Sequence, residues 1–265
     1  MVKSSAERGR FDRLYRWLSP QDPSTSYNEA LDKRHEGTGQ WFIQGEMFNS
    51  FKLGTVPFLW LNGIPGCGKT VLSSSVIEHL MQLDDSSSVL YFYFDFNNKR
   101  KGTLDSALRS LLWQLISHNQ RDAQVIEDLY TLCRDGLDQP STSNLSQKLA
   151  SILLKKSRSI VVLDALDECE TRMELLQWLA YMMVGKNAGF QVIATSRDEY
   201  DIHIAFERLT TPDCVIRLQQ ADVDKDIRSY IHAELHSDER FERWRARPDI
   251  RKTIETELMG KANGM

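Results

Sequence analysis

The strongest chemical signal in the sequence is the run GIPGCGKT at positions 63–70. It matches GxxxxGK[ST], the Walker A pattern, between a short apolar run and a helical pattern. Glycines at 63, 66 and 68 permit a positive φ, so that consecutive backbone N–H groups can converge on phosphate oxygens. Lys69 is then placed to reach the β- and γ-phosphates, and the Thr70 hydroxyl to ligate Mg²⁺. We therefore predict a phosphate-binding loop; the alternative is a glycine-rich turn with a surface lysine.

The nucleotide-binding set that this motif predicts consists of Gly63, Ile64, Pro65, Gly66, Cys67, Gly68, Lys69, Thr70 and Val71. Cys67 stands at the start of a predicted helix, where a thiol pKa is lowered, so one interpretation is a redox-sensitive thiol. We favour the simpler interpretation that it occupies a variable position of the motif.

A second motif combines an apolar run with carboxylates. Residues 160–163 are apolar and are followed by Asp164, with Asp167 and Glu168 close behind. This is the form of a Walker B element, in which a strand-terminal aspartate orients Mg²⁺. We expect Asp164 to serve the metal, Glu168 to orient or activate an attacking water, and Asp167 to be the second choice for that role. The alternative is an ordinary turn aspartate.

Two further cationic positions are candidates for phosphate contact. Arg197 follows the apolar run that ends in Ala194, at the sheet edge where ligands bind in open α/β folds, and could sense a γ-phosphate. A surface salt bridge is an equally good interpretation of Arg197. Lys99, Arg100 and Lys101 are interpreted as a loop, with a γ-phosphate contact as the less favoured alternative.

Five apolar runs predict strands that position these residues: 58–62, 89–94, 160–163, 190–194 and 214–218. Helical patterns lie between them at 69–83, 103–118, 123–133, 145–155 and around 175–182. This alternation predicts a three-layer α/β/α domain with a five-stranded, mainly parallel sheet. We place the NTPase core at 56–218, a helical lead-in at 1–55 and the start of a helical domain at 219–265.

Composition and charge favour a folded globular protein and exclude several other classes of protein. The 265 residues include 33 Lys+Arg and 37 Asp+Glu, a net charge of −4, and 41% hydrophobic residues, which is typical of a folded globular chain. We expect no nucleic-acid partner, since the basic stretch at 240–252 is interleaved with acidic residues and favours a solvated helix face. The four cysteines form no CxxC pair, the histidines show no metal-ligand spacing, and no run resembles a signal peptide or membrane span. We therefore expect a cytoplasmic protein.

The motifs together resemble the NACHT-type NTPases of the STAND class, above all fungal members related to vegetative-incompatibility proteins and the nephrocystin-like N-terminal family. The resemblance extends over about 27–265 and includes GTGQWF at 37–42, LYFYFDF at 90–96, VIATSRD at 192–198 and DIRSYIHAEL at 226–235. It implies binding of ATP or ADP (GTP being possible) with Mg²⁺, slow hydrolysis and a homo-oligomer in the triphosphate state. It also implies Glu168 as the hydrolytic acid, Arg197 as the first sensor and Thr38–Gly39 near the base.

Full-length relatives carry a winged-helix region with a sensor histidine, repeats and often an effector domain, so we interpret the sequence as a fragment or a short gene product. The primary hypothesis is a signalling NTPase that acts as a slow switch. One alternative is a nucleotide-holding scaffold without useful hydrolysis. The other is a small-molecule kinase, for which no lid signature is seen.

Overall fold

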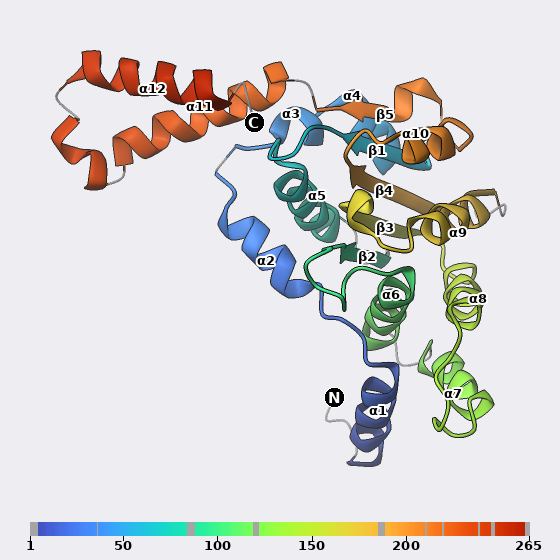
Figure 1. Cartoon of the computed structure of the whole chain (residues 1–265). Coiled ribbons are helices and arrows are strands. Elements are labelled where there is room, and N and C mark those ends of the chain that lie inside the picture. Colours follow the sequence, from blue (N-terminus) through green and yellow to red (C-terminus); the bar gives the residue numbers. More distant parts are fainter. Residues whose placement is uncertain are drawn as a thin grey trace.

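The computed structural model describes residues 5–35, 37–83, 88–118, 122–184, 189–209, 211–218, 220–237, 239–244 and 247–262. A five-stranded parallel sheet lies at its centre, in the order β2-β3-β4-β1-β5 (Figure 1). The strands are β1 (Phe58–Asn62), β2 (Ser88–Tyr93), β3 (Ser159–Asp164), β4 (Phe190–Ser196) and β5 (Val215–Arg217). The predicted α/β fold is therefore confirmed, and all five strands are parallel.

Burial follows strand position in the sheet. The three inner strands β1, β3 and β4 are buried at every residue, as continuous apolar runs require when helices cover both faces. The edge strand β2 is less buried, with Ser88, Val89 and Tyr91 partly exposed. The other edge strand, β5, has only three residues and begins after the 3₁₀ turn η3 (Pro212–Cys214), so it is shorter than predicted.

Six helices of the described residues connect these strands. They are α5 (Lys69–Leu83), α6 (Leu104–His118), α7 (Ala123–Leu132), α8 (Thr142–Leu153), α9 (Arg172–Val184) and α10 (Tyr200–Glu207). Helix α8 begins three residues earlier than predicted because Ser141 caps it, accepting a hydrogen bond from the Asn144 N–H. Helix α10 was not predicted, because its eight residues bury only Ile202 and Phe206 and show too little periodicity.

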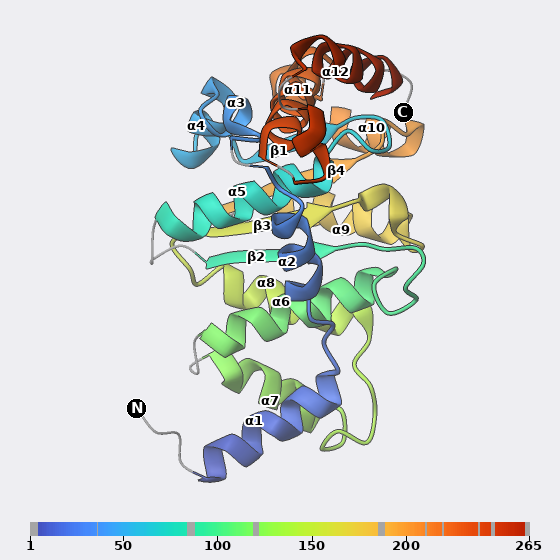
Figure 2. The same ribbon diagram turned by 90° about the vertical axis from the view of Figure 1, so that its left-hand side faces the viewer.

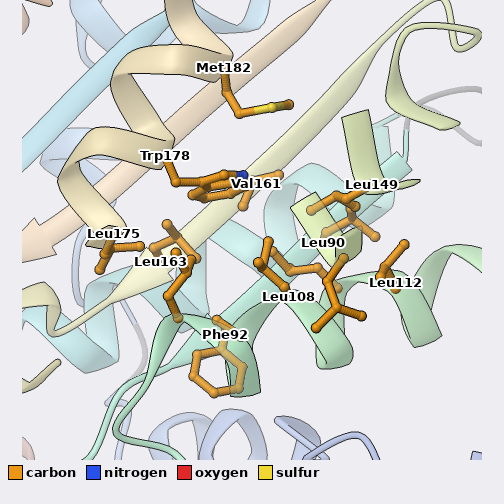
Figure 3. Close-up of a cluster of buried hydrophobic side chains, with 14 of the residues drawn as sticks. Leu90, Phe92, Leu108, Leu112, Leu149, Val161, Leu163, Leu175, Trp178 and Met182 are labelled. Atoms are coloured by element: carbon orange, nitrogen blue, oxygen red, sulfur yellow. The ribbon is translucent and has the colours of Figure 1, made fainter. Parts of the chain in front are cut away.

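The helices form layers on both faces of the sheet, with α5 on one side and α8 and α9 on the other (Figure 1). The larger apolar cluster joins the sheet to α6, α8, α9 and α10. Figure 3 shows part of it, with labelled residues Leu90, Phe92, Leu108, Leu112, Leu149, Val161, Leu163, Leu175, Trp178 and Met182. The second cluster joins α5 to the opposite face of the sheet.

Before β1, residues 5–35 and 37–57 form four helices, which together contribute to both clusters: α1 (Ser5–Leu18), α2 (Ser24–Asp32), α3 (Gln40–Ile43) and α4 (Glu46–Lys52). Trp17 of α1 is buried in the larger cluster, and Phe48 and Phe51 of α4 are buried in the second one. The buried Gln191 side chain on β4 also donates hydrogen bonds to the backbone oxygens of Phe51 and Val56. The N-terminal helices are thus tied to the sheet.

After β5, helices α11 (Gln220–Ser237) and α12 (Pro248–Ala262) pack against each other around a separate small cluster of Ile231, Leu235 and Met259. Figure 2 shows α12 at the opposite end of the molecule from α1 and α7. Among the described residues, no helix combines the length and apolar character that a membrane crossing needs.

Candidate functional site

The loop at 63–70 connects β1 to α5. Gly66 and Gly68 have φ values of 78° and 84°, the positive region that favours glycine, as predicted. Gly63 does not have a positive φ, so that part of the prediction is wrong. Close packing explains this glycine instead, since a Cβ there would lie 2.6 Å from Cys67 Sγ and 3.1 Å from Leu218 Cβ.

Lys69 folds back over its own loop. Its Nζ donates hydrogen bonds to the backbone oxygens of Gly63 and Ile64, each at 2.8 Å. Nζ also lies 3.7 Å from Cys67 Sγ. The ammonium group therefore lies inside the curve of the loop, where the motif predicts the phosphates.

Asp164 ends β3 and faces the start of α5. Its Oδ2 accepts a hydrogen bond from Thr70 Oγ1 at 2.7 Å, so the structure brings the two predicted metal ligands together. Its Oδ1 accepts hydrogen bonds from Ser73 Oγ at 2.9 Å and Thr195 Oγ1 at 2.7 Å. Burial raises the pKa of Asp164 above its usual range, although the three hydroxyl donors act in the opposite direction.

The sequence did not predict Ser73 and Thr195 as partners of this carboxylate. Ser73 lies one helical turn after Thr70, and Thr195 lies in the strand adjacent to β3. Helical spacing would have pointed to Ser73, but Thr195 depends on the order of strands, for which the sequence has no direct signal.

After β3, one residue in the left-handed conformation turns the chain and sets where the remaining carboxylates, Asp167 and Glu168, lie. Ala165 has φ 58° and ψ 54°, which costs a non-glycine residue about 1 kcal/mol. Its N–H donates to Thr195 Oγ1 at 2.9 Å, which holds the turn against β4. The 3₁₀ turn η2 (Leu166–Glu168) follows at once and carries both Asp167 and Glu168.

Arg197 and Asp167 form an ion pair between the turns that follow β4 and β3. Asp167 Oδ1 accepts a hydrogen bond from the Arg197 backbone N–H at 3.0 Å, and Oδ2 lies 3.0 Å from Arg197 Nε. The Asp167 side chain is 4% exposed, whereas that of Arg197 is 46% exposed. Both predicted residues therefore lie at the same edge of the sheet as the phosphate loop, and they contact each other.

Glu168 lies beside the loop that follows β2. Its Oε2 accepts a long hydrogen bond of 3.4 Å from the Phe96 N–H. Partial burial raises the pKa of Glu168, and the nearby carboxylates of Asp167 and Asp95 raise it further. A carboxylate with a raised pKa is a better proton acceptor, which suits the water-activating role predicted for this residue.

A cavity of about 190 Å³ adjoins the phosphate loop. Three segments wall it, and the lining residues are Lys33, His35, Thr38, Gly39, Trp41, Gly66, Cys67, Gly68, Val71, Leu72, Leu218, Asp226, Ile227 and Tyr230. Asp226 of α11 closes one side, where its Oδ2 accepts hydrogen bonds from the Gly39 N–H at 2.9 Å and from Trp41 Nε1 at 3.3 Å. The cavity is thus bounded jointly by the N-terminal segment, the loop and α11.

The model of one protein family, described as Nephrocystin 3, N-terminal, matches residues 37–197, which are more than half of the chain. The chain belongs to this family. The matched range contains the phosphate loop, the acidic motif and Arg197. The resemblance to the nephrocystin-like N-terminal family that the sequence indicated is thereby confirmed.

Among curated proteins, the vegetative incompatibility protein HET-E-1 of Podospora anserina is 23% identical over 175 residues, which are 64% of this chain and 13% of that protein. Among solved structures, Cdc6p from Pyrobaculum aerophilum aligns with a TM-score of 0.44 and 12% identity, over 80% of this chain and 52% of that one. A chain of the Drosophila ORC structure bound to poly(dA/dT) DNA and Cdc6 aligns with a TM-score of 0.39 and 10% identity, over 98% and 43%.

The other cationic candidates take part in contacts of a different kind. Lys99, Arg100 and Lys101 fall in the turns between β2 and α6, and the Lys101 ammonium donates to Ser26 Oγ at 2.8 Å. In the basic stretch, Arg247 pairs with Asp249, while Arg245 lies outside the described residues. No group of three or more His, Cys, Asp or Glu side chains able to hold a metal occurs in the part of the chain that the structure describes.

Proposed function

We propose that this family member binds a nucleoside triphosphate with Mg²⁺, hydrolyses it slowly, and acts as a cytoplasmic signalling switch, with ATP favoured over GTP. The observation that carries the proposal is the 2.7 Å contact between Thr70 Oγ1 and Asp164 Oδ2, at a loop whose glycines adopt positive φ. Thr70 belongs to the phosphate motif and Asp164 to the acidic motif, and the sequence separates them by 94 residues. Their contact is the arrangement that phosphoryl transfer with a bound metal requires.

The donor set suits Mg²⁺. Thr70 and Asp164 offer a hydroxyl and a carboxylate oxygen, and this hard ion prefers oxygen ligands. Mg²⁺ commonly takes only one or two ligands from the protein and the rest from phosphates and water, so a site without a cluster of carboxylates is expected. When bound, the ion would neutralise negative charge on the phosphates; Ser73 and Thr195 would keep the Asp164 carboxylate oriented.

The cavity beside the loop is the proposed site of the base. It presents aromatic and aliphatic side chains such as Trp41, Tyr230 and Leu72, next to the glycines that would approach the phosphates. Because α11 forms one wall, the same ligand would contact the NTPase core and the following helices. Phosphate and base contacts can then bias how α11 and α12 sit on the core, which is what a nucleotide switch needs.

The proposed roles of Glu168 and Arg197 are based on their positions in the site. Glu168 is proposed to accept a proton from the attacking water, and Arg197 to contact the γ-phosphate. The triphosphate form is proposed to form a homo-oligomer, and repeat and effector domains are proposed for full-length relatives. The chain covers only 13% of HET-E-1, so the homo-oligomer and the additional domains are proposals.

The direct test is to denature the purified protein, identify any released nucleotide, and measure Mg²⁺-dependent binding and hydrolysis. We expect Lys69→Ala to weaken triphosphate binding at least tenfold, because it removes a charge that contacts the phosphates. Glu168→Gln should bind normally and lose hydrolysis. Lys155→Ala, an exposed lysine in the turn after α8, is the matched control and should behave as wild type.

Other outcomes discriminate the alternatives. Unchanged triphosphate binding in Lys69→Ala would refute the phosphate-loop assignment. Near-zero hydrolysis in both wild type and Glu168→Gln, with nucleotide still bound, would favour the scaffold. ADP production that depends on an added acceptor would favour the kinase.

A further inference from the structure

The ion pair between Asp167 and Arg197 is more constrained than an ordinary surface pair. One carboxylate oxygen accepts from the Arg197 backbone N–H, and the other contacts Nε of the same residue, both at 3.0 Å. A backbone contact and a side-chain contact to one residue fix its main chain and the direction of its side chain together. The Asp167 side chain is 4% exposed, so water screens the pair poorly on that side.

The fold explains why these two residues meet. Strands β3 and β4 are adjacent and parallel, so the turns that follow them leave the sheet side by side. The left-handed Ala165 then turns the chain, and the 3₁₀ turn after it brings Asp167 to Arg197, the residue after the end of β4. The Ala165 N–H bond to Thr195 Oγ1 locks this turn to the strand that carries Arg197.

The contact leaves one side of the guanidinium group available. Asp167 contacts Nε, and in the described part of the chain neither terminal Nη group has a hydrogen-bond partner. The Arg197 side chain is 46% exposed. Two Nη groups in a planar fork match the oxygens of a phosphate, so the arginine can hold Asp167 with Nε and an anion with its far end.

We propose that Asp167 is a positioning residue that orients Arg197 toward the γ-phosphate, and that it does not activate the attacking water. This inference rests on the proposed function of the site. One Asp167 oxygen accepts a hydrogen bond from the Arg197 N–H, and the other forms the ion pair with Nε, so both are engaged with Arg197 and the carboxylate is poorly placed to receive a proton from water. Because the guanidinium is oriented before the ligand arrives, binding need not order it, and this favours the triphosphate over the diphosphate.

The experiment compares affinities of the full chain for a non-hydrolysable ATP analogue and for ADP, each with Mg²⁺. The variants are Asp167→Asn, Arg197→Gln and the double variant. Asparagine keeps an oxygen that can accept from the Arg197 N–H, so the turn is expected to survive, and circular dichroism checks this. Asp198→Asn is the matched control, because it changes an exposed acid in the same segment that pairs with His203 instead.

We expect Asp167→Asn to reduce the preference for the triphosphate analogue over ADP by roughly tenfold, the size of one lost charge-assisted contact. Arg197→Gln should reduce it at least as much. The double variant should lose no more than Arg197→Gln alone, because Asp167 acts through the arginine. Asp198→Asn should keep the wild-type preference.

A wild-type preference in Asp167→Asn, or losses that add fully in the double variant, would overturn the proposal. If Asp167→Asn fails to fold, Arg197→Lys tests the same contact, since lysine keeps the charge but lacks both Nε–H and the terminal fork. A wild-type preference in that variant would also overturn the proposal. Absence of nucleotide binding in the wild-type protein would instead refute the proposed function on which it rests.

Discussion

At the residue scale, Asp164 is the most heavily constrained charge of the site. It is 3% exposed, and its hydrogen-bond donors are hydroxyls from α5 and β4. Hydroxyl donors offset only part of the cost of burying a carboxylate, which is why its pKa stays raised. When no cation is bound, the buried Asp164 carboxylate therefore lowers the stability of the fold.

Asp164→Asn should accordingly stabilise the ligand-free protein at neutral pH by about 1 kcal/mol, a few degrees in melting temperature. A raised pKa means that the folded state binds the proton more tightly than the unfolded state. The contribution of Asp164 to the free energy of unfolding therefore falls as pH rises from about 4 through the raised pKa. Thermal melts between pH 5 and 8 should show a flatter profile for the variant.

Under the proposed function, Mg²⁺ and triphosphate raise the melting temperature of the wild type, and the same variant should lose that increase. Asp128→Asn, at an exposed position on α7 where the carboxylate contacts the Gln124 amide, serves as its control and should retain both the pH profile and the ligand effect. An apo protein that is less stable as Asp164→Asn than as wild type, at pH 7 to 8, would contradict this account of the buried charge.

Sequence patterns identified some residues of the site and missed others, for physical reasons. Lys69, Thr70 and Asp164 belong to motifs with fixed spacing, so their types alone indicate their chemistry. Thr195 escaped prediction because its contact with Asp164 requires β4 to lie next to β3. The pairing of Asp167 with Arg197 was not predictable, because it depends on the left-handed Ala165, a conformation that sequence does not signal.

At the element scale, the edge strand β2 has its outer backbone groups covered by a side chain. Gln114 of α6 accepts a hydrogen bond from the Tyr91 N–H at 3.0 Å, and its Nε2 donates to the Tyr91 oxygen at 2.9 Å. One glutamine amide thus makes the pair of contacts that a neighbouring strand would make. Such coverage protects an edge strand from pairing with other chains.

Gln114→Ala should destabilise the fold by about 1–2 kcal/mol, because it leaves two backbone groups of β2 without these partners. Urea denaturation measures the loss, and light scattering should show increased self-association through the uncovered edge. Gln147→Ala, at an exposed position on α8, is the control and should change stability by less than about 0.5 kcal/mol. Equal effects of the two substitutions would show that the contact with Tyr91 is not important.

Strands were easier to predict from the sequence than helix ends. Continuous apolar runs mark β1, β3 and β4 because both faces of these strands are buried. Helix limits depend on caps such as Ser141, and short helices such as α10 bury too few residues to produce a period. The order of the strands follows from packing between distant segments and is not encoded in their alternation.

At the scale of the whole molecule, the N-terminal and C-terminal helices differ in whether their apolar side chains pack into the core that includes the sheet. Leu14, Trp17 and Leu18 of α1 are buried in the larger core cluster, whereas α11 and α12 bury apolar side chains mainly in a cluster of their own. The N-terminal helix therefore adds to the stability of the core. The C-terminal helices contribute mainly a wall of the cavity, through residues such as Asp226.

Two truncations test this difference. Removing residues 1–22 should cost on the order of 5 kcal/mol, comparable to the stability of a whole domain, because three large side chains leave the core. Ending the chain at residue 218 should leave a folded core whose nucleotide affinity falls at least tenfold, since one wall of the cavity is lost. Circular dichroism, thermal melts and nucleotide titration measure these effects. A stable protein without α1 would contradict the assigned role of that helix.

The inward position of Lys69 changes how substitutions in the phosphate loop should be interpreted. Its ammonium group donates hydrogen bonds to two carbonyl groups of the loop and holds them in place. Under the proposed function, a phosphate group would compete with these carbonyls for the ammonium, so binding would require the lysine side chain to rotate. Alanine at position 69 would remove both the positive charge and the two hydrogen bonds to the loop, whereas arginine would retain the charge and alter the fit.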